Sequence, residues 1–208
     1  MAIQRCRLEN AGQIGRKNFV PVGTIEFVQE YLEGTIGVPR ELLMPVGNPW
    51  APRKWTDELD PDREVFVKDT KVFKSPWNGL RKGRELPAGH LWEVSEPIRD
   101  IKAEWRCFLR DRKLLAVQPY SGDPLVFPDP AQIKGLISDS IFGGLPACTL
   151  DVMVTASGET KPIEVHEFFS CGLYGFDDST QLPWMYLRAW QAILRRFGRT
   201  DILPSLTA

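Results

Sequence analysis

The sequence has few cysteines and histidines, and this scarcity argues against several classes of protein. Its four cysteines, at positions 6, 107, 148 and 171, form no CxxC pair, and its 208 residues include two histidines. Widely spaced cysteines are typical of reduced thiols in the cytosol, and so few histidines argue against a zinc site or a histidine-rich metal site. We therefore expect a cytoplasmic protein without structural disulfides.

Long apolar runs and an excess of charge are also missing. No run of 18 apolar residues is present, and residues 1–18 lack an apolar signal core, so we expect neither a membrane-spanning helix nor a signal peptide. The 26 basic and 27 acidic residues leave a net charge of −1, which argues against a general nucleic-acid binder or a membrane-surface protein. Neither GxxxxGK[ST] nor GxGxxG occurs, so a phosphate site would need other residues.

What remains is typical of a globular protein, with 43% hydrophobic and 25% charged residues. Proline-rich residues 37–63 indicate an irregular connection with short extended pieces, and residues 75–90 a glycine-containing loop. The pattern predicts helices over 25–32, 131–138 and 184–197, strands over 64–68 and 91–98, and hairpins over 103–119 and 148–167. Adjacent antiparallel strands mixed with helices indicate an α+β fold.

The second hairpin places two carboxylates opposite each other. A turn centred on residues 157–158 pairs Asp151 with Glu164 and Thr149 with His166, all on one face, while the other face is apolar. Opposed like charges cost up to about 1 kcal/mol. A Mg²⁺ ion can bridge the pair, one carboxyl can keep its proton and act as a general acid, or a wet face can tolerate the repulsion. His166 is then a ligand, an acid or base, or a surface residue.

Basic residues gather near the first predicted strand. Lys68 ends an apolar run, and Lys71 and Lys74 follow in steps of three, a pattern that suits either a phosphate chain or a solvated charge run. Further on, Glu104 and Arg106 point the same way from one strand. They form either a structural ion pair or a site where Arg106 neutralises a transferred phosphoryl group.

The last predicted helix has a basic face. Its apolar positions, among them Trp184 and Trp190, are spaced for burial, whereas Arg188 and Arg195 belong to a set of arginines on the other positions. The arginines form either a solvated face or a surface that binds an acidic partner.

Taken in order, five stretches resemble the ATP-grasp superfamily, and most closely a small branch of it encoded by phages and bacteria. Together they span about residues 20–176. The stretches are PVGTIEFV at 21–28, VFVKDTKVF at 65–73, VSEPI at 94–98, EWRCF at 104–108, and Asp151 with IEVH at 163–166 and GLYG at 172–175.

The resemblance implies an architecture. Two α+β lobes with antiparallel sheets would grip ATP, and the N-terminal substrate lobe would be reduced, because about 60 proline-rich residues precede Lys68. In these terms residues 1–63 form the reduced N-terminal region and residues 64–208 the ATP-grasp-like domain. That domain divides into subdomains of about 64–98 and 99–208.

The resemblance also implies roles for residues. The nucleotide-binding set would comprise Lys68 on the α- and β-phosphates, Lys71 and Lys74, a hinge of Ser95, Glu96 and Ile98 around adenine, and Glu104. Arg106 and Lys71 would be catalytic, and Asp151, Glu164 and His166 would hold Mg²⁺. His166 stands where most of these enzymes have asparagine. Since Mg²⁺ prefers oxygen ligands, His166 lies beside the ligands or the site accepts Mn²⁺.

The chemistry implied is ATP- and Mg²⁺-dependent ligation of a carboxylate to an amine or thiol through an acyl-phosphate. The acceptor would be a small molecule or a peptide that carries the carboxylate, with a separate amine donor. The alternatives are a phosphotransferase on the same fold and a nucleotide-binding module that has lost catalysis. A metal-free hydrolase that uses Asp151 and Glu164 as acid and base, or a Cys171–His166 nucleophile pair, is also compatible with the spacing.

Overall fold

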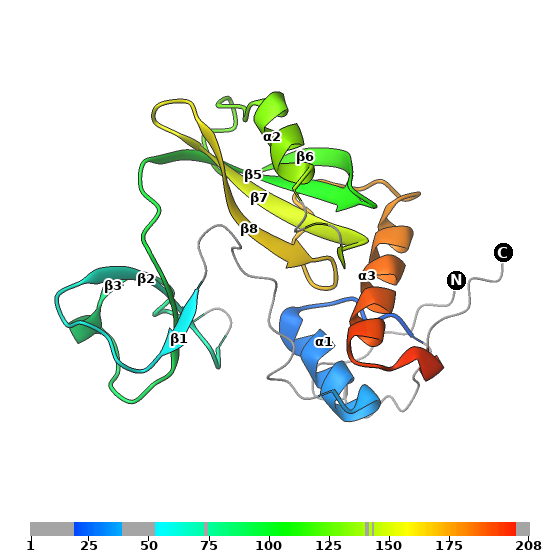
Figure 1. Ribbon diagram of the computed structural model, residues 1–208, viewed down its shortest axis with the longest axis horizontal. Helices are drawn as coiled ribbons and strands as arrows, with labels where there is room; N and C mark the ends of the chain where they lie inside the picture. Colours follow the sequence, from blue (N-terminus) through cyan, green and yellow to red (C-terminus); the bar gives the residue numbers. More distant parts are fainter. Residues whose placement is uncertain (1–18, 39–52, 73–74, 140–141, 143, 203–208) are drawn as a thin grey trace.

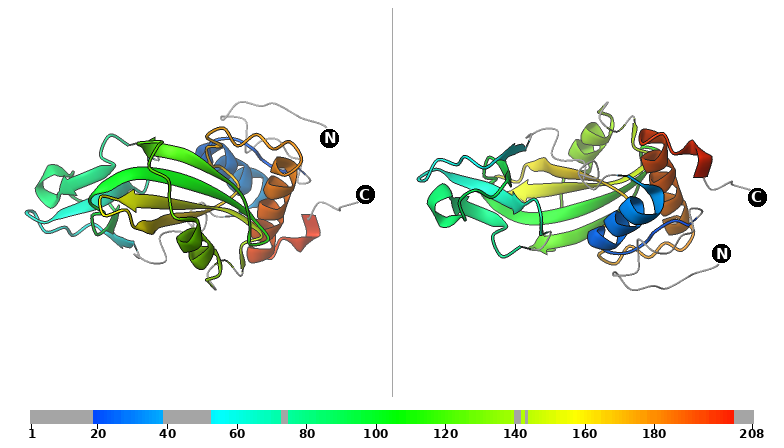
Figure 2. Two further views of the ribbon diagram at one scale, coloured as in Figure 1. Left: turned by 90° about the horizontal axis from the view of Figure 1, so that it is seen from above. Right: turned by 90° about the horizontal axis from the view of Figure 1, so that it is seen from below.

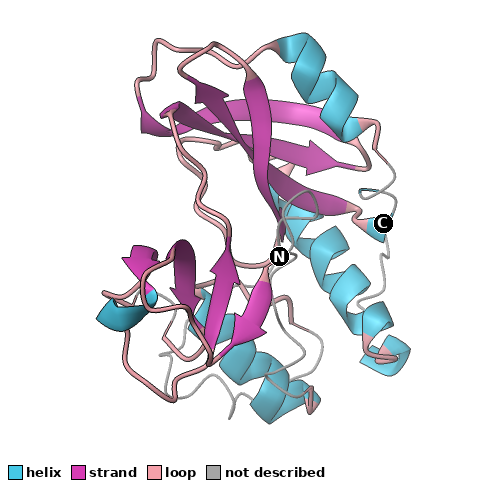
Figure 3. Ribbon diagram, turned by 60° about the vertical axis from the view of Figure 1, so that its left-hand side comes forward, coloured by secondary structure: helices cyan, strands magenta, loops and turns pink. Residues whose placement is uncertain are grey.

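The computed structural model describes residues 19–38, 53–72, 75–139, 142 and 144–202 (Figure 1). Within these residues, eight strands form two four-stranded antiparallel sheets, and helices pack on the second sheet. The predicted α+β class with two antiparallel sheets is confirmed. Figure 3 shows the sheets as two separate groups of strands joined by extended connections. In the described part of the chain, no helix is both long and apolar enough to span a bilayer.

The first sheet is small and carries its own core. Val65, Val67 and Trp92 are buried on one face, with Leu59 and Leu86 packed against them. The opposite face includes Lys68, because side chains alternate along a strand. In the order β1-β4-β2-β3, the strands are β1 (Lys54–Thr56), β4 (Trp92–Ser95), β2 (Glu64–Asp69) and β3 (Gly79–Lys82).

One feature of this sheet differs from the sequence prediction, and another agrees with it. Residues 75–90, predicted to be a loop, contain β3 and a turn of 3₁₀ helix, Gly83–Glu85 (η4), so this part of the prediction was wrong. The register Val67↔Gly79 gives the reason, since β3 is held by its pairing with β2 rather than by a pattern of its own. β1 is one of the short extended pieces expected before residue 64, and it pairs with β4. The domain division at 63/64 stays a prediction.

The second sheet has two different faces. Its strands, in the order β6-β5-β7-β8, are β6 (Lys113–Gly122), β5 (Ile101–Arg110), β7 (Ala147–Thr155) and β8 (Thr160–Glu167), and both predicted hairpins are confirmed. One face packs on α2 (Pro130–Ile137) through a cluster that includes Cys107 and Leu150. On the other face, Phe108 and Phe168 pack against Met185 of α3 (Leu182–Arg196). The rest of that face carries polar side chains.

The N-terminal helix packs against the C-terminal one. Thr24 caps α1 (Ile25–Tyr31) by accepting a hydrogen bond from the Phe27 backbone. The helix predicted over 25–32 is followed by a π-helical segment, Leu32–Ile36 (η2), which ends at Gly37 with its φ of 75°. The residues of α1 share one core cluster with Phe169 and Trp190, and both views of Figure 2 show α1 beside α3.

The last helix begins earlier than predicted and exposes one tryptophan. α3 starts at Leu182, and a short 3₁₀ segment, Thr200–Ile202 (η6), follows it. Trp190 is buried as expected, whereas Trp184 is 46% exposed, so its predicted burial was wrong. Trp184 lies in the first turn of the helix.

The two hairpins contain glycines that permit a direct test of the fold. Gly122 has φ of 78°, and a Cβ placed on it would lie 2.3 Å from the Lys102 carbonyl oxygen. We expect Gly122→Ala to lower the free energy of unfolding by about 2–4 kcal/mol, because a left-handed residue and a backbone clash are combined. Urea denaturation measures this change.

Gly158 is the matched control. Its φ is 84°, but a Cβ there would meet no atom within 4 Å. Gly158→Ala should therefore cost about 1 kcal/mol, the left-handed penalty alone. Equal losses in the two variants would contradict the packing described at the end of β6.

Candidate functional site

The predicted register of the second hairpin is confirmed. Asp151 lies opposite Glu164, and Thr149 lies opposite His166. A bulge follows directly, between Asp151 and Val152, and it shifts the pairing towards the turn. The two carboxylates therefore share one face of the second sheet, on its polar part.

Asp151 is paired with a buried arginine. Arg106 Nε donates to Asp151 Oδ1 at 2.8 Å and Nη2 donates to Oδ2 at 2.7 Å, because β5 and β7 place the two residues opposite each other. Burial raises the pKa of Asp151, and the bond from Arg106 opposes that shift. The alternative in which Arg106 pairs with Glu104 was wrong: its carboxylate partner is Asp151.

Two tyrosines hold the Arg106 guanidinium from the sides. Its carbon lies 5.0 Å from the ring centre of Tyr120, on β6, and 5.1 Å from that of Tyr174, in the loop after β8. Nη1 also donates to the Gly172 carbonyl at 3.2 Å. Cation–π contacts and a bidentate ion pair together fix the orientation of this side chain.

Glu164 receives cations from the other sheet. Arg53 Nη2 donates to Glu164 Oε2 at 2.5 Å, and Lys68 Nζ donates to the same oxygen at 3.1 Å. Arg53 precedes β1 and Lys68 lies on β2, so these contacts connect the two sheets. Burial raises the pKa of Glu164, but Lys68 and Arg53 outweigh it and lower the pKa to about 2. Glu164 is therefore ionised at neutral pH.

The opposed carboxylates are thus neutralised by the chain itself. Three ways to relieve the repulsion between the two carboxylates were predicted from the sequence, and none describes this arrangement. Arg106 forms an ion pair with Asp151, and Arg53 and Lys68 form ion pairs with Glu164. A third carboxylate, Glu104, lies close enough that Asp151 and Glu164 add to the effect of burial in raising its pKa. The site therefore contains both anions and cations within a small volume.

His166 is buried beside this cluster. Neither ring nitrogen makes a hydrogen bond within the described residues, and its ring lies 5.1 Å from that of Phe169. Burial lowers the pKa of His166 to about 4, so the ring is neutral at pH 7. The hydroxyl of Thr149, its partner across the strands, also has no hydrogen bond in the described structure.

The carboxylates suit a magnesium ion in one specific way. Among the described residues, no three His, Cys, Asp or Glu side chains form a group that could hold an ion by themselves, so His166 does not complete a ready three-ligand set. Mg²⁺ commonly binds one or two carboxylates together with water and substrate phosphates. Asp151 and Glu164 can supply these carboxylates. Both cations on Glu164 use Oε2, so Oε1 keeps its lone pairs for another ligand.

The remaining predicted nucleotide residues lie around β2 and β4. Lys71 is exposed just beyond β2, and Lys74 falls outside the described residues. Glu96 is exposed and forms an ion pair with Arg63. Ser95 and Glu96 line a groove of about 530 Å³ together with Val65. That groove opens on the face of the first sheet opposite to Lys68, because Val65 and Lys68 point to different faces.

Arg53 is the residue that sequence reasoning missed. It sits at the end of a proline-rich stretch without periodicity, and the basic pair that it forms with Lys54 is a weak signal. Tyr120, on β6, and Tyr174, in the loop after β8, were missed as well. The contacts of all three residues are made across distant segments.

Comparison with known proteins adds a family match. A family model described as an ATP-grasp domain of the R-two-K clade, family 2, matches residues 54–182. No curated protein matches the chain. Similar solved structures include the ATP-grasp ligase PsnB complexed with a minimal precursor, at 14% identity, with a TM-score of 0.43 and coverage of 75% of this chain. The chain spans 57% of the length of that PsnB chain.

Two further solved structures are similar. PsnB complexed with minimal precursor, Mg and ADP is 12% identical, with a TM-score of 0.44 and coverage of 75% of this chain and 57% of that one. A Chryseobacterium gregarium RiPP-associated ATP-grasp ligase, in complex with ADP and a leader and core peptide, is 11% identical. Its TM-score is 0.44, with coverage of 72% of this chain and 56% of that one.

The Arg106–Asp151 pair permits a test of stability. We expect Asp151→Asn to lower the free energy of unfolding by about 3 kcal/mol, because it leaves the buried Arg106 charge without a partner. The double variant Arg106→Met with Asp151→Leu removes both charges and should recover much of that loss. Urea denaturation of the variants tests this, and an unchanged stability for Asp151→Asn would contradict the buried pair.

Glu164 permits a test of pH dependence. Its pKa is lowered from an ordinary 4.5 to about 2, so its ion pairs stabilise the folded state above pH 4.5 and lose that effect as pH falls towards 2. The wild type should therefore exceed Glu164→Gln in stability at pH 7, and the difference should shrink below pH 4.5. A difference that is independent of pH, measured by urea denaturation at pH 7, 4.5 and 3, would refute the assignment.

Proposed function

The chain belongs to family 2 of the R-two-K clade of ATP-grasp domains, and from this premise we propose that it is an ATP- and Mg²⁺-dependent ligase that joins a carboxylate to an amine or thiol. Membership of the family supports ATP-dependent ligase chemistry. The class of acceptor and the acyl-phosphate route are parts of the proposal.

One observation carries the proposal: Lys68 of the first sheet and Arg53, directly before that sheet's β1, form ion pairs with the Glu164 carboxylate of the second sheet. A triphosphate carries more negative charge than one carboxylate. Lys68 and Arg53 can therefore bind phosphate oxygens in place of the Glu164 carboxylate. The nucleotide would thus lie between the two sheets, on the face of the first sheet that carries Lys68. Ser95, Glu96, Ile98 and Glu104 are proposed to hold its remaining parts, with Lys74 as a further candidate.

Asp151 and Glu164 are the residues proposed to hold the metal. Their oxygens are the donors that Mg²⁺ prefers, and water and phosphate oxygens would complete the coordination. The ion would supply charge neutralisation on the phosphates. His166 lies beside these carboxylates and is neutral. It can therefore orient a bound water or act as a ligand if Mn²⁺ binds in place of Mg²⁺.

Arg106 and Lys71 are proposed as the catalytic cations. Arg106 is held in place by Asp151, Tyr120 and Tyr174, so its guanidinium needs little reorganisation to neutralise charge on a transferred phosphoryl group. Lys71 lies in the exposed segment directly after β2, the strand that carries Lys68. A side chain there can reach a phosphate chain that starts at Lys68.

The proposed reaction has two steps. An acceptor carboxylate oxygen attacks the γ-phosphorus of ATP, giving an acyl-phosphate and ADP. An amine or thiol then attacks the acyl carbon, the bond to the phosphate oxygen breaks, and inorganic phosphate leaves. The protein contributes positioning and fixed positive charge rather than covalent chemistry. A peptide or small molecule that carries the carboxylate, in the cytoplasm, is the proposed partner.

Nucleotide binding tests the proposal most simply. Isothermal titration calorimetry with a non-hydrolysable ATP analogue and Mg²⁺ should show saturable binding that weakens at least about tenfold in Lys68→Ala and in Arg53→Ala, because each variant removes a cation from the phosphates. EDTA should weaken binding to the wild type. Lys54→Ala, an exposed lysine next to Arg53, is the matched control and should bind as the wild type does.

The outcomes separate the alternatives. Unchanged affinity in both Lys68→Ala and Arg53→Ala would contradict the proposed site. With an acceptor in hand, a ligated product with free phosphate supports the ligase, whereas a stable phosphorylated acceptor indicates a phosphotransferase on the same fold. Binding without turnover of any acceptor indicates a module that has lost catalysis.

A further inference from the structure

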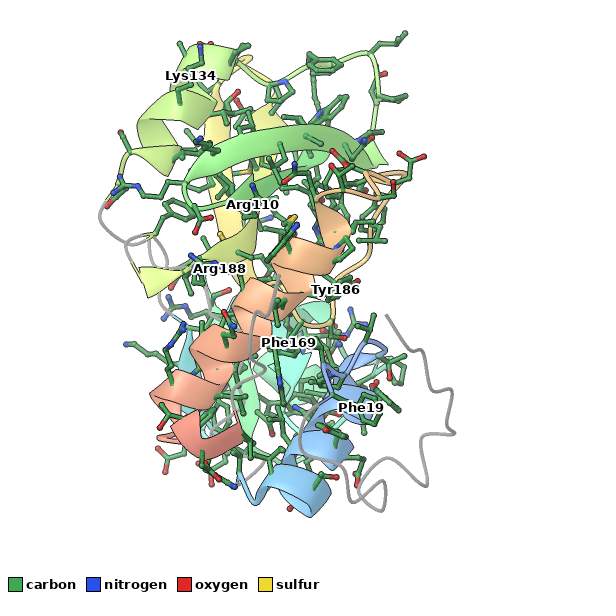
Figure 4. The ribbon with its side chains drawn as sticks, turned by 90° about the vertical axis from the view of Figure 1, so that its right-hand side faces the viewer. Phe19, Arg110, Lys134, Phe169, Tyr186 and Arg188 are labelled. Carbon is green, nitrogen blue, oxygen red and sulfur yellow. The ribbon has the colours of Figure 1, made fainter. Side chains whose placement is uncertain are left out.

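Two adjoining grooves lie where α3 crosses the end of β5 and β6. One, of about 450 Å³, is lined by Arg112, Arg195 and apolar residues that include Leu145. The other, of about 340 Å³, is lined by Arg110 and Trp184. Both are lined by Asp111 and Arg188, so they adjoin each other, and we call the two together the arginine trough. Figure 4 shows Arg110 and Arg188 on the neighbouring strand and helix at this end of the molecule.

The arginine trough is strongly positive in a chain whose net charge is −1. Its charged lining consists of four arginines and one aspartate. Arg188 donates to Asp111 at 3.0 Å, and Arg112 donates to the Ser138 carbonyl at 2.7 Å. Arg195 is exposed and has no ion pair within the described residues. The neutralisation inside the trough is therefore incomplete.

The turn between β5 and β6 supplies an independent observation. It consists of Asp111, with φ of 48°, and Arg112, with φ of 63°. A two-residue turn with two positive φ values favours glycine at its second position, and an arginine there is less favourable than glycine. Strain of this kind is concentrated at functional positions. The sequence thus keeps a guanidinium at the trough in a conformation that glycine would adopt more easily.

We propose that the arginine trough binds an acidic peptide segment that also carries apolar side chains. Guanidinium groups bind carboxylates in bidentate fashion, and the half-exposed ring of Trp184 in one groove and Leu145 in the other offer apolar surface. Asp111 in the centre and the overall charge of −1 oppose a continuous polyphosphate backbone, so a nucleic acid fits less well.

The trough is separate from the nucleotide site. Arg110 lies four residues along β5 from Arg106, which corresponds to about 13 Å. Binding of the peptide therefore does not depend on the proposed ligase activity, and it can be measured without ATP.

Fluorescence anisotropy provides the test. The probe is a fluorescein-labelled dodecapeptide of alternating glutamate and leucine, and the comparison probes are the same peptide with lysine in place of glutamate and a labelled dodecathymidylate. The acidic peptide should bind saturably to the full chain with half-saturation below about 100 μM, and 500 mM NaCl should weaken it. The lysine peptide should not bind. Absence of saturable binding of the acidic peptide, or tighter binding of the dodecathymidylate, would overturn the proposal.

Variants locate the binding. Arg195→Glu should weaken the acidic peptide at least about tenfold, whereas Lys102→Glu should change its affinity less than twofold. Lys102 is exposed, carries the same charge and lies eight residues from Arg110 on the same strand, about 26 Å away. Equal losses in the two variants would overturn the assignment to the trough.

Arg112→Gly separates binding from folding. Glycine relieves the positive φ, so the melting temperature should stay the same or rise, while the peptide should bind at least about fivefold more weakly. Wild-type affinity in this variant would show that the strained arginine serves no binding role and would contradict the proposal.

Discussion

The contact of one carboxylate with two cations is the interaction on which this structure depends. Glu164, on the second sheet, accepts hydrogen bonds from Lys68 of the first sheet and from Arg53, directly before β1. Without them Glu164 would face Asp151 as an unneutralised like charge on a partly buried sheet. The same contact brings together the groups that a magnesium–triphosphate complex requires, namely carboxylates for the metal and cations for the phosphates.

The two carboxylates are neutralised in different ways, and the difference has a consequence for binding. Asp151 forms an ion pair with Arg106 within its own sheet, and two tyrosines make cation–π contacts with Arg106. Glu164 is held across the two sheets. In the proposed binding mode, a nucleotide between the sheets would compete with Glu164 for its two cations and would leave the Arg106–Asp151 pair in place. On this proposal, the half of the site around Arg106 is preorganised, and the half around Glu164 would exchange its partners on binding.

Much of the site was predictable because local rules determine it. A four-residue turn and the alternation of side chains set the register that places Asp151 opposite Glu164. The β-rich run of residues 64–68 predicted the strand that carries Lys68. Arg53 was not predictable, since its partner Glu164 lies 111 residues away and its own stretch has no periodicity. The sequence also does not specify that β5 pairs with β7. This pairing places Arg106 opposite Asp151, so Arg106 forms its ion pair with Asp151 and not with Glu104. β3 was missed for the same reason, because it depends on β2.

The most direct measurement is a crystal structure of the protein with Mg²⁺ and a non-hydrolysable ATP analogue. We predict that the triphosphate lies between the sheets, with its oxygens within hydrogen-bond distance of Lys68 Nζ and the Arg53 guanidinium, and with the metal on Asp151 and Glu164. A nucleotide bound in the groove beside Leu59 and Val65, on the far face of the first sheet, with its triphosphate out of reach of Lys68 and Arg53, would contradict the account.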